Sequence, residues 1–134
     1  MSLIKFDYTS NLMLVNVFLW NQRQAKFENM LITFDTGASN TVISKDILYM
    51  LGYNLGSGEK TRIVTASGVE YVEPMVMDKL RIGSHILEDV QIYAHTFPES
   101  SFSLGVLGLN VISQFDIQMK FSTKELVLDK LIHL

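Results

Sequence analysis

The sequence predicts an all-β fold with one or two short helices, and three observations lead to this expectation. The 134 residues include only two prolines and are 48% apolar, and small turn clusters divide them into many short apolar segments, as in all-β chains. Several segments alternate apolar and polar residues, which is the period of a strand with one buried face. Few stretches have helical spacing. A chain of this length and composition is expected to form a single domain over residues 1–134.

The first predicted element is a β-hairpin, and a short helix follows it. Leu12 to Trp20 and Lys26 to Phe34 are rich in β-branched and aromatic residues, and the polar Asn21 to Gln24 joins them. Further along, Ser44 can cap a helix that Gly52 ends, because glycine tolerates the left-handed conformation of a C-terminal cap. The apolar face of this helix would consist of Ile47, Leu48 and Leu51.

A second hairpin and a second short helix are expected later in the chain. Met75 to Ile82 and His85 to His95 form the strands, and Gly83 with Ser84 supplies the turn. Within the second strand the apolar residues are Val90, Ile92 and Ala94, and they alternate with Asp89, Gln91 and Tyr93. The helix is predicted at Asn110 to Gln114. Each hairpin is thus followed by a glycine-bearing loop and a short helix, which is a weak internal repeat.

The last predicted element is a hairpin near the carboxyl end. Its first strand has one face expected to be buried, formed by Phe115, Ile117, Met119 and Phe121. Its other face is expected to be solvated and consists of Asp116, Gln118 and Lys120. Ser122 to Lys124 then turns the chain into Leu126 to Leu128.

Composition excludes several classes of function. The net charge of −3 provides no clustered positive charge for a nucleic acid. No apolar run approaches the roughly 20 residues that span a bilayer, so we expect no membrane segment and a cytoplasmic protein. The chain has no cysteine, which excludes disulfides and thiolate metal sites. Its histidines, His85, His95 and His133, lack the spacing of a zinc site, so we expect neither a metal nor a cofactor.

The most informative stretch for chemistry runs from Leu31 to Asn40. It places the carboxylate of Asp35 directly after an apolar strand, where a charged group must find hydrogen bonds or share a proton. Thr36 offers a donor and an acceptor that can lock the loop, and Gly37 leaves room for a second backbone to approach. This arrangement favours a partner for the carboxylate.

These residues resemble the signature of a known family. Asp35-Thr36-Gly37-Ala38 is similar to the active-site motif of aspartic peptidases, and Val106-Leu107-Gly108 resembles their second hallmark, which passes beneath the catalytic loop. Leu80 to Gly83 resembles a strand and turn of the bacterial, retropepsin-like branch. The likeness covers about Leu12 to Leu128. It implies a retropepsin-like closed barrel of mostly antiparallel strands.

The resemblance also implies roles for individual residues. Asp35 would be catalytic, with Thr36, Gly37 and Ala38 supporting its loop, whereas Gly108 would be structural. The position of the substrate-binding flap in this family corresponds to Val64, Thr65, Ala66, Ser67 and Gly68. The plainer alternatives are a turn aspartate at position 35, an ordinary strand-to-helix junction at Gly108 and a surface hairpin without a function.

The sequence contains only half of the catalytic pair that the family mechanism needs. That mechanism uses two aspartates that share a proton, of which one activates water and the other donates a hydrogen bond to the substrate carbonyl. The other aspartates are not followed by Thr-Gly or Ser-Gly: Asp7, Asp46, Asp78, Asp89, Asp116 and Asp129. A symmetric homodimer that brings two copies of Asp35 together would supply the pair.

Two positions depart from the pattern of the viral members of the family. Those members pair an Asp after the catalytic triplet with an Arg after the second-hallmark glycine, and Ser39 and Leu109 stand at these positions here. The dimer would therefore be held differently. Leu126 to Leu134 and the residues before Asn11 are candidates for the interface, because terminal strands often complete the intersubunit sheet in this family.

The sequence therefore predicts an aspartic endopeptidase that acts as a homodimer on polypeptides, without a cofactor or a covalent intermediate. Two alternatives stay open. A catalytically silent dimer of the same fold would bind peptides without cleaving them, since a fold does not by itself fix a function. A domain of a larger precursor would cleave only its own chain.

Overall fold

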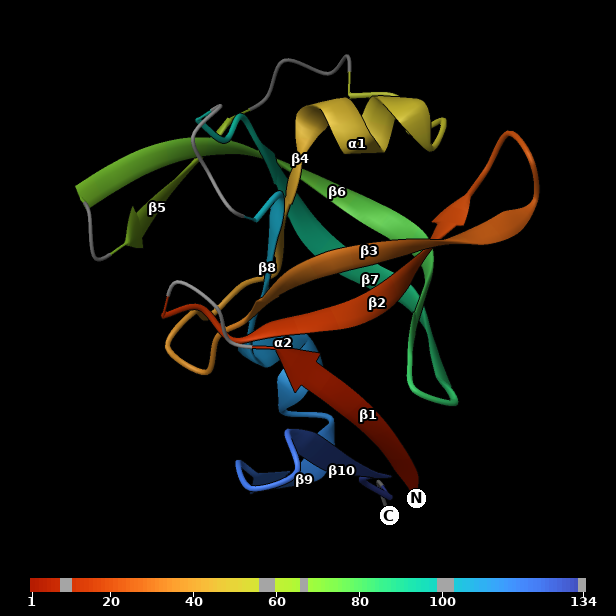
Figure 1. Cartoon of the computed structure of the whole chain (residues 1–134). Helices are drawn as coiled ribbons and strands as arrows, with labels where there is room; N and C mark the ends of the chain where they lie inside the picture. Colours follow the sequence, from red (N-terminus) through yellow and green to blue (C-terminus); the bar gives the residue numbers. More distant parts are fainter. Residues whose placement is uncertain (8–10, 56–59, 66–67, 99–102, 133–134) are drawn as a thin grey trace.

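The computed structural model describes residues 1–7, 11–55, 60–65, 68–98 and 103–132, and Figure 1 shows a mostly β architecture. The strands are β1 (Ser2–Asp7), β2 (Leu14–Asn21), β3 (Lys26–Phe34), β4 (Val42–Ser44), β5 (Thr61–Thr65), β6 (Gly68–Ile82), β7 (His85–His95), β8 (Gly105–Leu107), β9 (Phe115–Lys120) and β10 (Glu125–Lys130). The helices are α1 (Lys45–Met50) and α2 (Leu109–Ile112).

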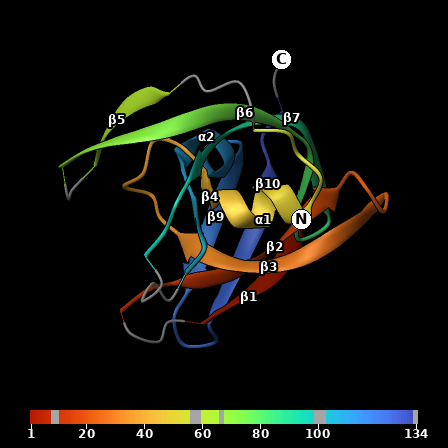
Figure 2. The same ribbon diagram turned by 90° about the horizontal axis from the view of Figure 1, so that it is seen from above.

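Six strands form a closed barrel. β2, β3, β8, β4, β7 and β6 pair in this order, and the ring closes where β6 pairs with β2. The β3–β8 and β4–β7 pairs are parallel, and the other four pairs of the ring are antiparallel. The barrel is therefore mixed but mostly antiparallel. Figure 2 views it from above, with the β5–β6 hairpin extending to one side.

The two predicted long hairpins are confirmed and supply most of the barrel wall. β2 and β3 pair from Leu14 with Thr33 to Asn21 with Lys26. β6 and β7 pair around the turn at Gly83, which has a φ of 59° and so adopts the left-handed conformation that favours glycine. β6 is longer than predicted, because it begins at Gly68 rather than near Met75.

Apolar side chains from every barrel strand meet in the interior. The predicted alternation on β7 is confirmed, since its three apolar residues Val90, Ile92 and Ala94 are buried. Side chains of other strands that are fully buried include Val17, Leu19, Ile32, Ile43, Met77, Leu80 and Leu107. Burying an aliphatic side chain of this size contributes about 1.5–3 kcal/mol, so this core stabilises the barrel.

Cation–aromatic contacts cover the seam where the barrel closes. The guanidinium of Arg81 lies 4.0 Å from the ring centroid of Phe18, its cross-strand partner. The ammonium of Lys79 lies 4.4 Å from the ring centroid of Trp20. Such contacts contribute about 0.5–1 kcal/mol at exposed sites. These contacts cover the short junction between β2 and β6, which consists of two residue pairs, Phe18 with Arg81 and Leu19 with Leu80.

The carboxyl-terminal hairpin forms as predicted, but the predicted burial of its first strand is only partly correct. Phe115 is buried and Ile117 is half-buried, whereas Met119 and Phe121 are 40% and 56% exposed. In the described sheet β9 is an end strand with β10 as its neighbour, and the face of β9 that was predicted to be buried extends beyond the barrel. Phe121 packs edge-on against Phe6 with ring centroids 5.5 Å apart. Alternation predicted a strand here but not how far the core extends.

The terminal strands pair within one chain. β10 lies between β1 and β9, so both of its edges carry hydrogen bonds. The apolar side chains of Leu126 and Leu128 are fully buried. The part of β10 that was predicted to hold a dimer interface therefore has an intramolecular role. Residues 8–10 and 133–134 of the predicted interface segments lie outside the described residues.

Both predicted helices are present, each shorter or shifted by a residue or two. α1 buries Leu48, and Leu51 follows as its C-cap, before Gly52 with a φ of 92°. Ser44 occupies the N-cap position as predicted. Its side chain makes no capping hydrogen bond, so the predicted side-chain cap is wrong. Ser44 is instead the last residue of β4. Neither helix in the described ranges is of a length and apolarity that would cross a membrane.

Tyr53, just after α1, makes the stability of the protein depend on alkaline pH. The phenol is buried and donates a hydrogen bond to the carbonyl oxygen of Trp20 at 2.8 Å. Burial raises the pKa of Tyr53 to about 12, against a smaller opposing contribution from a hydrogen bond with the Asp78 backbone. The unfolded chain loses this proton near pH 10. The stabilisation is therefore complete below pH 10 and is lost as the pH rises from 10 to 12.

We expect the free energy of unfolding to fall more steeply between pH 10 and pH 12 in the wild type than in the Tyr53→Phe variant. Urea titrations at pH 9, 10 and 11 would measure this difference. The variant is less stable at pH 9, because the carbonyl of Trp20 loses its donor, but it has no phenol to ionise at position 53. Parallel decreases in the two proteins would contradict the assignment.

Candidate active site

Asp35 lies in a loop that directly follows β3, beside the second predicted hallmark. The parallel pairing of β3 with β8 places Thr33 opposite Val106 and Phe34 opposite Leu107. The backbone N–H of Asp35 donates to the carbonyl oxygen of Leu107 at 3.1 Å. The two motifs, about 70 residues apart in the printed sequence, are therefore joined by the barrel itself.

The loop around Asp35 is held by backbone hydrogen bonds. The N–H of Gly37 donates to Oδ1 of Asp35 at 2.8 Å, and the N–H of Ala38 donates to the Asp35 carbonyl oxygen at 3.2 Å. Asp35 is half-buried, whereas Thr36 and Gly37 are exposed. One oxygen of the carboxylate is thus oriented by the loop. A side chain fixed in this way and still open to solvent can exchange protons with a bound molecule.

Gly108 is required by a close approach of two backbone segments. A Cβ atom at this position would clash with the backbone of Asn40, just after the Asp35 loop. The following residue, Leu109, donates its N–H to the carbonyl oxygen of Ala38 at 2.8 Å. The second hallmark therefore packs against the Asp35 loop and contributes a structural glycine.

The residue that locks this junction is Thr41, which the sequence analysis missed. Thr41 is fully buried, and its hydroxyl donates to Oδ1 of Asn110 at 2.8 Å and accepts from the N–H of Gly108 at 3.1 Å. Asn110 also donates from its amide nitrogen to the carbonyl oxygen of Gln91 at 2.8 Å. In the sequence, the one sign of this role is that a threonine stands six residues after Asp35. By contrast, Thr36 makes no hydrogen bond through its side chain within the described chain.

We expect the Thr41→Val variant to lose about 1–3 kcal/mol of unfolding free energy, because it keeps the shape but leaves the Gly108 N–H buried without an acceptor. Urea denaturation would measure this change. Thr33→Val is a matched control on β3, since Thr33 is half-buried and has no side-chain hydrogen bond to the described residues. The control is expected to change stability by about 0.5 kcal/mol or less. Equal effects of the two substitutions would contradict the role of the Thr41 hydroxyl.

The residues predicted for the flap fall on the hairpin formed by β5 and β6. Val64 pairs with Val69 and Thr65 pairs with Gly68. Ala66 and Ser67, which the prediction also included, lie outside the described residues. β5 is an edge strand of the sheet. In both Figure 1 and Figure 2 the hairpin projects on the side of the barrel where the chain leaves β3.

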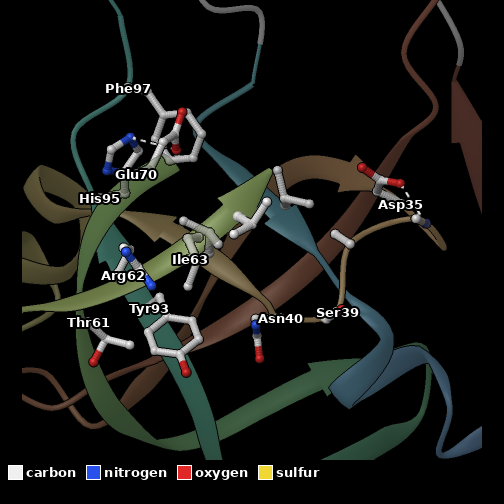
Figure 3. Close-up of a pocket in the computed structure, with 15 residues that line it drawn as sticks. Asp35, Ser39, Asn40, Thr61, Arg62, Ile63, Glu70, Tyr93, His95 and Phe97 are labelled. Atoms are coloured by element: carbon white, nitrogen blue, oxygen red, sulfur yellow. Dashed lines mark hydrogen bonds and ion pairs between the residues drawn. The ribbon is translucent and has the colours of Figure 1, made fainter. Parts of the chain in front are cut away.

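A pocket of ≈ 750 Å³ lies between the Asp35 loop and the β5–β6 hairpin. This size is within the range of ligand-binding clefts. The loop that contributes Asp35 also contributes Ser39 and Asn40, and the hairpin contributes residues that include Ile63 and Glu70 (Figure 3). The remaining lining residues include Val42, Tyr93, His95, Phe97 and Val106. Asp35 and the predicted flap therefore border one cavity.

The two positions that depart from the viral pattern lie at the same junction. Ser39 is exposed and accepts a hydrogen bond on its carbonyl oxygen from the N–H of Asn110, at 3.2 Å. Leu109 is 39% exposed. The hydrogen bonds that both residues make with the described chain involve their backbone atoms, and neither a serine nor a leucine side chain carries a charge at neutral pH. Within the described ranges, no cluster of three His, Asp or Glu side chains has the geometry to hold a metal ion.

The chain is similar to known proteins in sequence and in fold. A family described as aspartyl protease matches residues 26–111, which include Asp35, the β5–β6 hairpin and Gly108. Among solved structures, the fold is similar to a retropepsin-like aspartic protease from Rickettsia conorii. The TM-score is 0.68 at 19% sequence identity, and the match covers 94% of this chain and 87% of that one. No curated protein matches the chain in sequence.

The predicted fold class is confirmed by this similarity and by the closed, mixed barrel with its two short helices. At 19% identity the structural match supports the fold and nothing finer. The match to the family covers more than half of the chain and contains both predicted hallmarks. The Asp35 loop therefore lies within the segment that matches the aspartyl protease family and within the fold that the sequence predicted.

Proposed function

The chain belongs to the aspartyl protease family, and from this premise we propose that it is an endopeptidase whose active site is completed by a second copy of the same chain. The observation that carries the proposal is the position of Asp35. Its carboxylate is oriented by the Gly37 N–H, is open to solvent and borders a pocket large enough for a peptide segment. Thr36, Gly37 and Ala38 would support this carboxylate.

The need for a second copy follows from the carboxylates available in one chain. The other carboxylate that lines the pocket, Glu70, is paired with His95 at 3.3 Å and lies away from Asp35 in Figure 3. No other Asp in the sequence is followed by Thr-Gly or Ser-Gly. A two-fold axis near the exposed Asp35 loop would place two identical carboxylates together, as proton sharing requires.

The reaction proposed for this pair uses no covalent intermediate. One Asp35 carboxylate accepts a proton from a water molecule, whose oxygen attacks the carbonyl carbon of the peptide bond. The other Asp35, protonated, donates to the carbonyl oxygen as charge develops there. The tetrahedral intermediate collapses when the leaving nitrogen takes a proton from the pair, which breaks the C–N bond and restores one shared proton.

The β5–β6 hairpin would act as the flap over an extended substrate. β5 has a free edge in the described sheet, and an extended peptide can add to such an edge as a further strand. Val64, Thr65 and Gly68 would lie at the end of the hairpin that closes over the substrate. Apolar lining residues such as Ile63 and Val106 favour apolar substrate side chains near the cleaved bond.

The dimer would use edges that the chain leaves open. β10 has strands on both sides, so an intersubunit sheet cannot be built on it without displacing β1 or β9. β9 has only β10 beside it in the described sheet, and its Met119 is 40% exposed. Sedimentation across a range of concentrations would measure the oligomeric state.

Cleavage of a mixed peptide library, read by mass spectrometry, tests the proposal. We expect the wild type to cleave peptides at protein concentrations where it is dimeric and the Asp35→Asn variant to cleave none. Binding of peptides without cleavage by either protein would favour the silent binding domain. Cleavage confined to a longer precursor that contains the chain would favour self-processing. Equal cleavage by both proteins would overturn the proposal.

A further inference from the structure

The end of the pocket that lies away from Asp35 contains a carboxylate and an imidazole in contact. Glu70 on β6 and His95, the last residue of β7, approach each other with Oε2 and Nε2 3.3 Å apart. Figure 3 shows the two side chains beside Phe97, separated from Asp35 by the apolar lining of the pocket. The imidazole and the Phe97 ring are in edge contact at 5.7 Å between centroids.

We propose that Glu70 makes this end of the pocket a subsite for a basic side chain, a lysine or arginine, in the peptide substrate. The inference rests on the proposed endopeptidase function and extends it. It adds a charge preference to the apolar preference expected at the cleaved bond. The basic residue would lie at a position removed from that bond, because Glu70 and Asp35 lie at different ends of the pocket.

The register of the β5–β6 hairpin places Glu70 on the pocket side. Glu70 pairs with Ile63, and both are half-buried. The neighbouring pair, Val64 with Val69, is 82% and 54% exposed, and Tyr71 is 62% exposed. Because successive residues of a strand point to opposite faces, Glu70 and Ile63 share the less exposed face of the hairpin. Val64 also borders the pocket, at its solvent-exposed rim.

The charges around the pocket favour a cation at this end. The lining side chains that carry or can carry charge are Asp35, Glu70, His95, Tyr93 and Arg62. Arg62 also lines the pocket, but it is exposed, so solvent and salt screen its positive charge. The carboxylates of Asp35 and Glu70 are half-buried and less screened, so they favour a cation in the pocket.

The Glu70 carboxylate is accessible to a ligand. Its side chain is 36% exposed, and the one ion pair it makes with the described residues, to His95, uses Oε2. The ammonium or guanidinium of a substrate can approach the remaining oxygen without breaking that contact. Charge-assisted hydrogen bonds are stronger than neutral ones, and partial exposure reduces the gain, so we expect about a tenfold preference.

Matched peptides test this subsite. Each member of a set carries Lys, Met or Glu at one position along an otherwise constant cleaved sequence, and kcat/KM is measured at the pH at which the wild type cleaves fastest. We expect the wild type to prefer Lys over Met at one position by about tenfold. Glu70→Gln is expected to remove this preference, because the charge is lost while the size of the side chain is kept. Glu70→Lys is expected to favour the Glu peptide.

Glu88→Gln is the matched control, because Glu88 is an exposed residue of β7 that does not line the pocket. It is expected to keep the Lys preference. Cleavage by the wild type without a Lys or Arg preference, or with one that survives in Glu70→Gln, would overturn the subsite and leave the endopeptidase proposal intact. A preference for the Glu peptide that is lost in Arg62→Gln would assign the charge selection to Arg62 instead.

Binding keeps the subsite testable if no peptide is cleaved. Fluorescence anisotropy of the Lys and Met peptides with the Asp35→Asn protein measures recognition without chemistry. Tighter binding of the Lys peptide, lost when Glu70→Gln is added, would support the subsite even if the endopeptidase proposal fails. Equal binding of the two peptides, or no binding of either, would overturn it.

Discussion

Replacing Asp35 with asparagine is expected to abolish peptide hydrolysis and to leave the fold intact. The carboxylate is the proposed general base and proton donor, and loss of such a group lowers kcat by about 10³-fold or more. Among the described residues, the Asp35 carboxylate accepts a hydrogen bond from the Gly37 N–H, which an asparagine oxygen also accepts. Circular dichroism and urea denaturation of the variant would show whether the fold is retained while peptide cleavage is assayed.

Mixing the variant with the wild type distinguishes a shared site from a site within one chain. If each site needs two Asp35 carboxylates and subunits exchange freely, an equimolar mixture keeps about a quarter of its dimers fully wild type. Activity per mole of total protein then falls to about a quarter of that of the pure wild type, rather than to half. A fall to half would indicate that one chain suffices.

Replacing Lys45 with methionine is expected to cost about 3 kcal/mol of unfolding free energy, because it leaves a buried carboxylate without its cation. Lys45 at the start of α1 and Glu73 on β6 form an ion pair of 2.7 Å. Glu73 is 7% exposed, and its Oε2 is buried with no hydrogen-bond partner among the described residues. Urea denaturation at pH 7 measures the loss.

The double variant Lys45→Met, Glu73→Leu supplies the control. Removing both charges leaves no unpaired carboxylate, and buried ion pairs are often replaced by apolar residues at little cost. We expect the double variant to recover most of the stability lost in Lys45→Met. If the double variant were as unstable as the single one, lost packing by the lysine stem would be the cause and the charge argument would fail.

The local elements were predictable because their signals lie within a few residues of one another. The β2–β3 and β6–β7 hairpins follow from alternation and turn residues, and α1 follows from the spacing of Ile47, Leu48 and Leu51. The Ser44 cap was wrong, because the residue ends β4 and its side chain makes no capping bond. Met119 and Phe121 were expected to be buried but are exposed. Alternation predicts a strand with one apolar face, but it does not show which part of that face other elements cover.

The Asp35 loop and its neighbour at Gly108 were found as two separate motifs, and their contact was inferred from a resemblance. Thr41 and Asn110, which join them, were not singled out, because a buried threonine has no pattern that distinguishes it from a surface one. Glu70 and His95 are 25 positions apart and meet only through the register of β6 with β7.

The sequence by itself determined the strand-rich class, the hairpins and the single Asp-Thr-Gly triplet on which the proposed two-chain active site rests. Only the tertiary structure decided how the barrel closes through Phe18 and Arg81, and that β3 and β8 run parallel and bring the two motifs together. The reason is physical. Hairpin pairing is set by neighbouring residues, whereas closure and parallel pairing join distant segments whose contact depends on the packing of the whole core.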